Sequence, residues 1–317
     1  MTLSRETRMK PSIASITTAY NAAHRLPRQI DALLRQTRAL QEIVVVDNGS
    51  TDGTSAMLAE RYPQVTVLRL SSNAGAAGGW AAGLTYTALE KRHDWIWNFD
   101  DDSVPGDSAL DTMLSSAREI TEDPSVGMLV PLPVHESTGV SYPPLLWRDG
   151  LIKPAKDVLQ GPVWFADVAV ASGCMVRREV VEAVGLPRAD FFMDFFDFEY
   201  CLRMRSRKYK IAVINECPFS HELGDTVVIR FARRSRVWSQ HAPWREYYMS
   251  RNLTYAAFWL YPASKTKQFA VLHLFRHAVA ILLFGAQKAA SLKKLLQGVV
   301  DGRRGRLGVR FLPHLGT

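Results

Sequence analysis

The first hundred residues alternate between two hydrophobic patterns. Runs of apolar, β-branched residues predict strands, and apolar residues at helical spacing predict the helices between them. Strands are predicted over residues 12–20, 42–47, 64–70 and 94–100, and helices over 23–36, 55–62 and 76–92. Because strands that alternate with helices pair in parallel, this order predicts a doubly wound, mostly parallel α/β sheet. In such sheets, ligands bind beyond the carboxyl ends of the strands.

The pattern loosens after Pro133. Residues 135–150 are polar and contain Pro and Gly, which predicts a loop. Further on, the pattern predicts a strand and helix over 166–185, a helix over 191–209, a strand over 210–216 and helices from about Trp238 onward. The chain is therefore expected to have three parts, which are a leader (residues 1–11, without predicted structure), an α/β domain (12–237) and a basic, amphipathic helical region (238–317).

The composition is that of an ordinary globular protein. With 317 residues, 47% hydrophobic and 22% charged, the chain is long enough to bury one large core. The three cysteines are odd in number and lack CxxC spacing, which favours neither a disulfide framework nor a zinc site and indicates a reducing, cytoplasmic setting. The N-terminus is charged and has no apolar segment, so no signal peptide is predicted.

Positive charge is concentrated at the C-terminal end. The net charge is +8, and residues 261–317 carry ten Lys and Arg against one acid, Asp301. A local basic region indicates an anionic surface, either a membrane or a nucleic acid. The same region contains the apolar segment Phe269–Ala286, which favours a membrane.

This apolar segment has Arg276 and His277 near its middle. Because a charge is costly at the centre of a bilayer, we expect the helix to lie in the membrane interface and not to cross it. The alternative is a helix that packs on the protein's own core with a solvated basic face.

Three consecutive carboxylates, Asp100, Asp101 and Asp102, follow the strand predicted over 94–100. Adjacent like charges repel, so this arrangement is costly unless a cation or hydrogen-bond donors neutralise it. A divalent cation prefers such oxygen ligands. The alternative is a solvated acidic turn.

Two other segments lie near predicted strand ends. Asp47, in VVVDNGSTDGT, is placed where a nucleotide site would use a side chain to bind a base or ribose, although the turn around it equally suits a helix-capping loop. The small residues of SSNAGAAGGWAAG (71–83) indicate a close approach of the backbone, either to a ligand or to a neighbouring strand.

A cluster of acids among aromatic residues follows in MDFFDFEYCLRM, where Asp194, Asp197 and Glu199 lie among four aromatic side chains. Desolvation by such neighbours raises the pKa of a carboxylate, as a general base at neutral pH requires. The alternative is a helix N-terminus enriched in acids that complement the helix dipole. Downstream, His221 follows a predicted strand and is a candidate metal ligand.

Together, these segments carry a resemblance to a known family. The ordered set VVVDNGSTDGT, NAGAAGG, FDDDSVP, DFFDFEYCLR, HELG and YYMSRN resembles the family 2 glycosyltransferases with the GT-A fold, and within them the bacterial galactofuranosyl- and rhamnosyltransferases. The resemblance extends over roughly residues 12–252. It implies a GT-A domain over residues 12–237.

The resemblance also implies a role for each matching residue. Asp197 would be the catalytic base, with Asp194 and Glu199 binding the acceptor. Asp100, Asp102 and His221 would hold Mn²⁺ or Mg²⁺. Donor binding would fall to Thr18, Asp47, Asn73, Gly79, Trp80 and Asp101.

The implied reaction is an inverting transfer of a sugar from a UDP- or dTDP-linked donor to a glycan or lipid-linked glycan of the bacterial cell envelope. It would take place on the anionic inner face of the plasma membrane, with no role for nucleic acid. The small residues after Asn73 favour UDP-galactofuranose over dTDP-rhamnose. A non-catalytic scaffold at the membrane and a nucleotidyltransferase are the alternatives, and the sequence leaves the acceptor, the linkage and the oligomeric state open.

Overall fold

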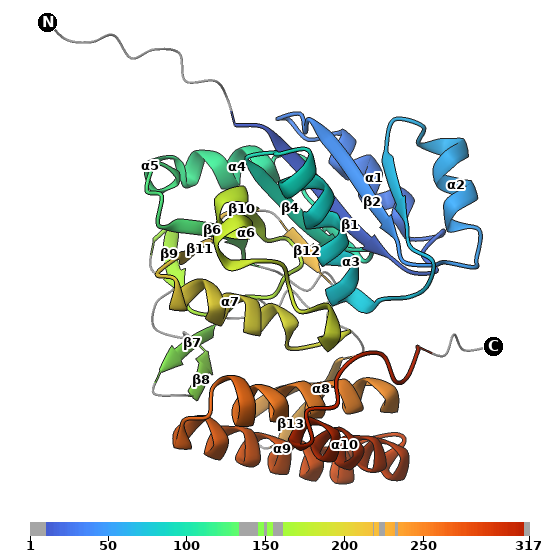
Figure 1. The fold of residues 1–317 in the computed structure, drawn as a ribbon, viewed down its shortest axis with the longest axis vertical. Coiled ribbons are helices and arrows are strands. Elements are labelled where there is room, and N and C mark those ends of the chain that lie inside the picture. Colours follow the sequence, from blue (N-terminus) through green and yellow to red (C-terminus); the bar gives the residue numbers. More distant parts are fainter. Residues whose placement is uncertain are drawn as a thin grey trace, which may run out of the picture.

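The structure is a computed structural model, and it describes residues 11–132, 145–148, 151–154, 161–217, 219–221, 226–231 and 234–313. Residues 1–10 of the predicted leader lie outside this part. The chain forms a sheet with helices on both faces, and a group of C-terminal helices lies below it (Figure 1).

The sheet has eight strands in the order β3-β2-β1-β4-β10-β6-β11-β9. Its first half is parallel, because β1 pairs in parallel with both β2 and β4, and β2 with β3. These four strands occupy Ile13–Ala19 (β1), Glu42–Asp47 (β2), Thr66–Arg69 (β3) and Trp95–Asp100 (β4). Four strands of the second half are Val126–Pro131 (β6), Val163–Ala166 (β9), Met175–Arg177 (β10) and Lys210–Ile214 (β11).

The second half of the sheet is mixed. β6 and β11 are parallel, whereas β10 runs antiparallel to its neighbours β4 and β6, and β9 runs antiparallel to β11. The mostly parallel sheet with flanking helices confirms the predicted fold class.

Two apolar cores cover the two faces of the sheet. One packs Leu26, Ile30 and Leu110 from α1 (Leu26–Leu34) and α4 (Ala109–Ser116) against one face. The other packs Trp80 and Tyr200 from α3 (Gly75–Leu84) and α7 (Phe196–Ser206) against the opposite face. The remaining helices of this part are α2 (Thr54–Arg61), the π-helix η1 (Thr85–Glu90), α5 (Arg118–Thr121) and α6 (Arg178–Val184).

Three segments differ from the predicted elements. The predicted helix over 191–209 begins only at Phe196, and a short 3₁₀ helix, η2 (Ala189–Phe191), and a turn precede it. Within the predicted loop, Leu145–Arg148 forms strand β7, which pairs with β8 (Leu151–Pro154). Two further pairs join β5 (Ser103–Pro105) to β12 (Phe219–His221) and β13 (Thr226–Phe231) to β14 (Arg234–Ser239).

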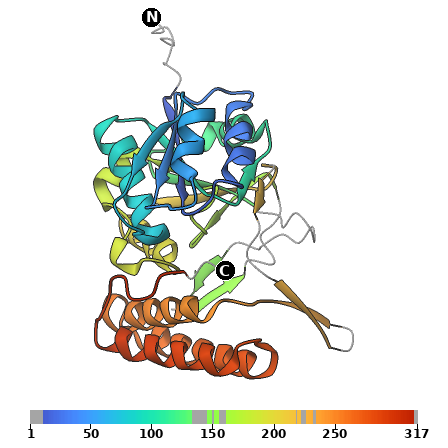
Figure 2. The same ribbon diagram turned by 90° about the vertical axis from the view of Figure 1, so that its right-hand side faces the viewer.

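The C-terminal helices are α8 (Pro243–Tyr255), the π-helix η3 (Ala256–Leu260), α9 (Ser264–Phe284) and α10 (Lys288–Arg303) (Figure 2). α10 packs closely along α8. A Cβ added at Gly298 would lie 2.1 Å from Ser250 Oγ, and one at Gly302 would lie 2.4 Å from the Arg251 carbonyl oxygen. These glycines therefore bring the two helix backbones into contact.

α9 is long and apolar enough to cross a membrane by length and composition, and it is the one such helix in the described part of the chain. Only 11% of its most apolar stretch is buried. Its exposed side chains include Val271, Leu272, Phe275, Val279, Leu282, Leu283 and Phe284. The helix thus presents most of its apolar side chains outward and not to the protein's own core.

Candidate active site

The carboxyl ends of three neighbouring strands place the first group of site residues. In the parallel register of the sheet, Thr18 on β1 lies opposite Asp100 on β4, and Ala19 lies opposite Asp47 on β2. Thr18 Oγ1 is buried and has no hydrogen-bond partner in the described structure. The sheet therefore brings Thr18, Asp47 and Asp100 to one edge, where the sequence predicts a ligand site.

Asp47 is fully buried and holds the loop that follows β2. Its Oδ1 accepts a hydrogen bond from the Ser50 N–H at 2.9 Å, and its Oδ2 accepts one from the Ser55 hydroxyl. These contacts match the loop-capping alternative for this segment. A role in reading the base stays a prediction.

Asp101 contacts the loop after β1. Its carboxylate accepts a hydrogen bond from the Tyr20 N–H at 3.3 Å and lies 3.0 Å from the Arg25 guanidinium. Burial raises the pKa of Asp101 to about 6, the charges of Asp102 and Asp100 add to the rise, and Arg25 opposes it. The repulsion expected from three adjacent acids therefore contributes to the raised pKa of Asp101.

The short β5–β12 pair brings His221 to the same edge. Its main chain lies opposite Ser103, which directly follows Asp102. The imidazole lies outside the described side chains, so its role as a metal ligand stays a prediction.

Asp197 lies in the first turn of α7, where its carboxyl is desolvated. Burial raises its pKa to about 7. A hydrogen bond from the Phe198 N–H, at 2.9 Å, opposes this rise, and the charges of Asp194 and Asp100 add to it. Asp194 and Asp100 therefore both lie close enough to Asp197 for their charges to act on it, although Asp100 comes from a distant part of the chain.

Asp194 is paired with a residue that the sequence pattern did not single out. The Arg245 guanidinium, at the start of α8, donates to both oxygens of Asp194 at 2.8 to 3.1 Å. The Asp194 carboxylate raises the pKa of Arg245 above its ordinary value, and the charges of Asp100 and Asp102 add to the rise. Arg245 thus pairs with Asp194 and lies near enough to Asp100 and Asp102 for their charges to act on it.

The turn that carries Asp194 has an unusual backbone. Phe192, Asp194 and Phe195 all have φ between 60° and 65°, a region that side chains with a Cβ rarely adopt. Such a conformation persists only where the surrounding structure enforces it.

α8 supplies that enforcement through a buried pair of polar residues. Asn252 donates its Nδ2 hydrogens toward the carbonyls of Phe191, Met193 and Asp194 at 2.7 to 3.0 Å. Arg251, fully buried, donates to the Phe191 carbonyl at 2.8 Å and to the Gly308 carbonyl at 2.5 Å. The Arg-Asn of YYMSRN therefore holds the turn before α7 in place.

The small-residue segment allows close packing. A Cβ added at Gly79 would lie 2.2 Å from Thr18 Cγ2, and one at Gly83 would lie 2.4 Å from Ile16 Cγ2. Asn73 Oδ1 accepts hydrogen bonds from the Gly75 N–H and from Asn48 Nδ2, which ties two loops together. These contacts favour the packing alternative for this segment.

Trp80 and Glu199 are both buried against or within α7. Trp80 is 2% exposed and packs edge-on against Phe196 and Tyr200, with ring centroids at 6.1 and 5.1 Å. Glu199 is buried and lies 2.7 Å from Arg203 on the same helix. The roles predicted for these two residues in donor and acceptor binding stay predictions.

The acids fit a divalent cation by their chemistry. Asp100 and Asp102 offer hard oxygen ligands at one edge, and a cation there would relieve the repulsion that acts on Asp101. Among the described side chains, which exclude that of His221, no three His, Cys, Asp or Glu groups lie close enough to hold an ion. The fit therefore requires further ligands, such as the oxygens of a bound diphosphate.

The doubly wound, mostly parallel sheet with acids at its strand ends agrees with the fold that the sequence resemblance implies. Residues 15–185 match the family described as glycosyl transferase family 2, and the chain belongs to that family.

Several bacterial enzymes are similar to this chain. It is 26% identical over 307 residues to dTDP-rhamnosyl transferase RfbF of Shigella flexneri, covering 95% of this chain and 98% of that protein. It is 25% identical over 188 residues to galactofuranosyltransferase GlfT1 of Mycolicibacterium smegmatis, covering 57% and 61%. It is also 28% identical over 158 residues to N-acetylglucosaminyl-diphospho-decaprenol L-rhamnosyltransferase of Mycobacterium tuberculosis, covering 47% and 50%.

Two solved structures share the fold at low sequence identity. A structure of GalNAc-T7 with UDP, GalNAc and Mn²⁺ matches with a TM-score of 0.61 and 14% identity, covering 93% of this chain and 56% of that one. S. aureus TarS matches with a TM-score of 0.51 and 13% identity, covering 92% and 43%. This chain thus spans about half the length of each.

Proposed function

We propose that this protein is an inverting glycosyltransferase in which Asp197 is the catalytic base. The observation that supports this proposal most is the environment of Asp197, whose pKa is raised to about 7 beside the charges of Asp194 and Asp100. A base with that pKa is half ionised near neutral pH, where it can accept a proton during the reaction.

The proposed reaction is a single displacement. Asp197 accepts the proton of an acceptor hydroxyl, and the hydroxyl oxygen forms a bond to the anomeric carbon of the donor sugar. The bond from that carbon to the nucleoside diphosphate breaks, and its electron pair leaves with the diphosphate. Attack from the opposite face inverts the anomeric configuration.

Asp100, Asp102 and His221 would hold the divalent cation. When bound, the cation neutralises charge on the departing diphosphate. Thr18 and Asp101, at the same edge, would contact the nucleotide, since Thr18 Oγ1 is without a partner in the described structure. Arg245 would orient Asp194 toward the acceptor through their paired hydrogen bonds.

For the donor we propose dTDP-rhamnose, with UDP-galactofuranose as the second candidate. The similarity to the Shigella dTDP-rhamnosyl transferase runs through nearly the whole of both chains, whereas that to GlfT1 covers 57% of this chain in one species and 68% in another. The small residues that favour galactofuranose in the sequence have a separate explanation, because Gly79 and Gly83 allow α3 to pack on β1.

The decisive experiment measures release of nucleoside diphosphate from each donor with Mn²⁺, with EDTA, and with and without a glycan acceptor. A glycosyltransferase releases the diphosphate in a metal- and acceptor-dependent way. A scaffold releases none, and a nucleotidyltransferase releases pyrophosphate. Faster release from UDP-galactofuranose than from dTDP-rhamnose would reverse the choice of donor.

We further propose that α9 lies on the anionic inner face of the plasma membrane, where it would bring the site to a lipid-linked glycan. Phe275 and Leu283 on this helix are 66% and 62% exposed. Exposed basic residues on and next to α9 and α10, such as Lys265, Arg276 and Lys288, would contact lipid phosphates. Apolar insertion combined with basic contacts is typical of interfacial helices.

A further inference from the structure

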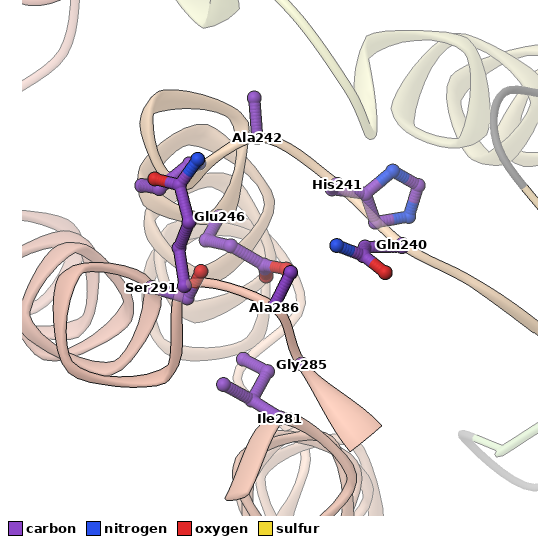
Figure 3. A pocket seen from close by; sticks show the side chains of 10 residues that line it. Gln240, His241, Ala242, Glu246, Ile281, Gly285, Ala286 and Ser291 are labelled. Carbon is purple, nitrogen blue, oxygen red and sulfur yellow. The ribbon is translucent and has the colours of Figure 1, made fainter.

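A polar cavity lies where α8, α9 and α10 meet (Figure 3). Its volume is about 220 Å³, and it is lined by residues of the segment before α8, the end of α9 and the start of α10. The lining residues are Gln240, His241, Ala242, Pro243, Glu246, Ile281, Gly285, Ala286, Gln287 and Ser291.

Two buried side chains in this cavity keep hydrogen-bonding atoms unused. The Glu246 side chain is 2% exposed, and its Oε2 lies 2.6 Å from His277 Nε2, while no described residue bonds its Oε1. Ser291 is 5% exposed, and its hydroxyl has no partner in the described structure. Neither atom belongs to the fully buried unpaired atoms of the described residues, so both are open to the cavity and available to hydrogen-bond a ligand there.

The lining suits a neutral, hydroxyl-rich ligand. It offers a carboxylate oxygen, a hydroxyl, two amides and the imidazole of His241, with the apolar side chains of Pro243 and Ile281 beside them. Burial, together with the charge of Arg245, lowers the pKa of His241, which leaves the imidazole neutral. The carboxylate disfavours phosphate, whereas a sugar ring presents both hydroxyls and an apolar face.

The cavity is next to the proposed active site. Glu246 directly follows Arg245, which holds Asp194. His241 is close enough to Asp194, Glu246 and His277 for their charges to act on it. α8 therefore turns one residue toward the catalytic acids and the next into the cavity.

We propose that this cavity is an acceptor subsite, which binds a sugar ring adjoining the one whose hydroxyl Asp197 deprotonates. This inference rests on the proposed function and adds where the acceptor lies. It predicts that the enzyme gains affinity from the second ring of a glycan acceptor.

The test uses two probes, octyl rhamnoside and the octyl glycoside of a rhamnose disaccharide, and two matched variants. Ala286→Trp places an indole in the cavity from an exposed position, and Ala290→Trp makes the same change at an exposed position of α10 outside it. Ala286→Trp should lower kcat/KM for the disaccharide about tenfold, to the level of the monosaccharide, as expected for loss of roughly 1.4 kcal/mol of binding. Ala290→Trp should leave both values within about twofold of wild type.

A smaller substitution controls for structural distortion by the indole of Ala286→Trp. Ser291→Ala removes one hydroxyl and should lower the disaccharide value about threefold to tenfold, which corresponds to one hydrogen bond. Equal losses for both probes, or no preference for the disaccharide in the wild type, would overturn the subsite.

A direct binding measurement separates this inference from the proposed function. Saturation-transfer NMR of the disaccharide, in the presence of dTDP and Mn²⁺, should show contact with both rings in the wild type and with one ring in Ala286→Trp. If the wild type binds both rings but transfers no sugar, the proposed function fails and the binding site stands. Displacement of the disaccharide by pyrophosphate would indicate an anion site and overturn the inference.

Discussion

Two groups of acids form the candidate site, and the protein positions them in different ways. Asp47 and Asp100 are placed by the register of neighbouring parallel strands. Asp194 lies in a turn with positive φ angles, and hydrogen bonds from α8 hold this turn. The donors on α8 are more than fifty positions further along the chain than Asp194. Asp197 follows in the first turn of α7. The sheet determines the geometry of the first group. The geometry of the second group depends on α8, which can be altered without changing the sheet.

The largest effect is expected at the strand-end group. Asp102→Ala should abolish transfer and remove metal-dependent nucleotide binding, because a proposed metal ligand is lost that no neighbour would replace. Titration calorimetry with dTDP or UDP and Mn²⁺ measures this. Asp107→Ala is the matched control, since Asp107 is an exposed acid paired with Arg35. Unchanged nucleotide affinity in Asp102→Ala would show that the triplet is only an acidic turn.

The next effect tests the second group. Asp197→Asn keeps the shape of the side chain but cannot accept a proton, so turnover should fall by a factor of ~10²–10⁴ while nucleotide and metal bind nearly as before. Asp194→Asn should cost less, because Asp194 is paired with Arg245 and is not the proposed base. A rate for Asp197→Asn above roughly a tenth of wild type would contradict the assignment of the base.

The pH dependence sharpens this test. Because the pKa of Asp197 is about 7, the wild-type rate should fall as the pH drops below 7, and the residual rate of Asp197→Asn should lose that dependence. The folded state binds this proton more tightly than the unfolded chain, so ionisation costs stability as the pH rises from the ordinary value of 3.8 through 7. Asp197→Asn should therefore raise the midpoint of thermal unfolding at pH 8, and the difference should vanish near pH 4.

A smaller loss of turnover should show that the second group of acids can be disturbed without affecting the first. Asn252→Ala removes the donor to three carbonyls of the turn before α7, so turnover should fall about tenfold to a hundredfold while nucleotide affinity stays within about twofold. The free energy of unfolding should fall by about 1–3 kcal/mol because buried carbonyls lose their partner. Asn215→Ala, which removes an amide bonded to Gly161 away from this turn, is the control. Parallel losses of nucleotide binding and turnover in Asn252→Ala would show that the two groups are not independent.

The smallest effect on catalysis is expected at the exposed face of α9. Phe275→Asp should leave turnover on a soluble acceptor unchanged but weaken binding to anionic vesicles by about tenfold or more, the loss expected when one large apolar side chain no longer inserts. Leu34→Asp places the same charge at an exposed leucine of α1. Equal vesicle binding by Phe275→Asp and Leu34→Asp in sedimentation assays would exclude α9 as the membrane contact.

Much of the strand-end group could be predicted from sequence because its geometry is local. The alternating pattern predicts the parallel strands, and the edge at which Asp47 and Asp100 meet follows from that. The carboxylate run, likewise, indicates a cation from chemistry alone.

The second group was harder to predict because its contacts are remote. Nothing in the spacing around Asp194 indicates Arg245 as its partner, and helical periodicity extends the predicted helix back through the turn that precedes Phe196. One signal was available, since Arg251 and Asn252 are adjacent polar residues in a helix that also carries four aromatic side chains. Such a pair, if buried, must satisfy several backbone groups.

The contacts of the buried Arg251 affect the order in which the protein can fold during synthesis on the ribosome. Its guanidinium joins the carbonyl of Phe191 to that of Gly308, and Tyr248 bonds the main chain of Phe311 close by. The sheet can fold while the chain is still emerging, because all its strands are made before Asn215. Arg251, which bonds the Phe191 carbonyl before the turn of Asp194, in contrast cannot gain its full set of bonds until Gly308 has been synthesised. A nascent chain can therefore form the sheet first and complete the contacts that support the second group of acids last.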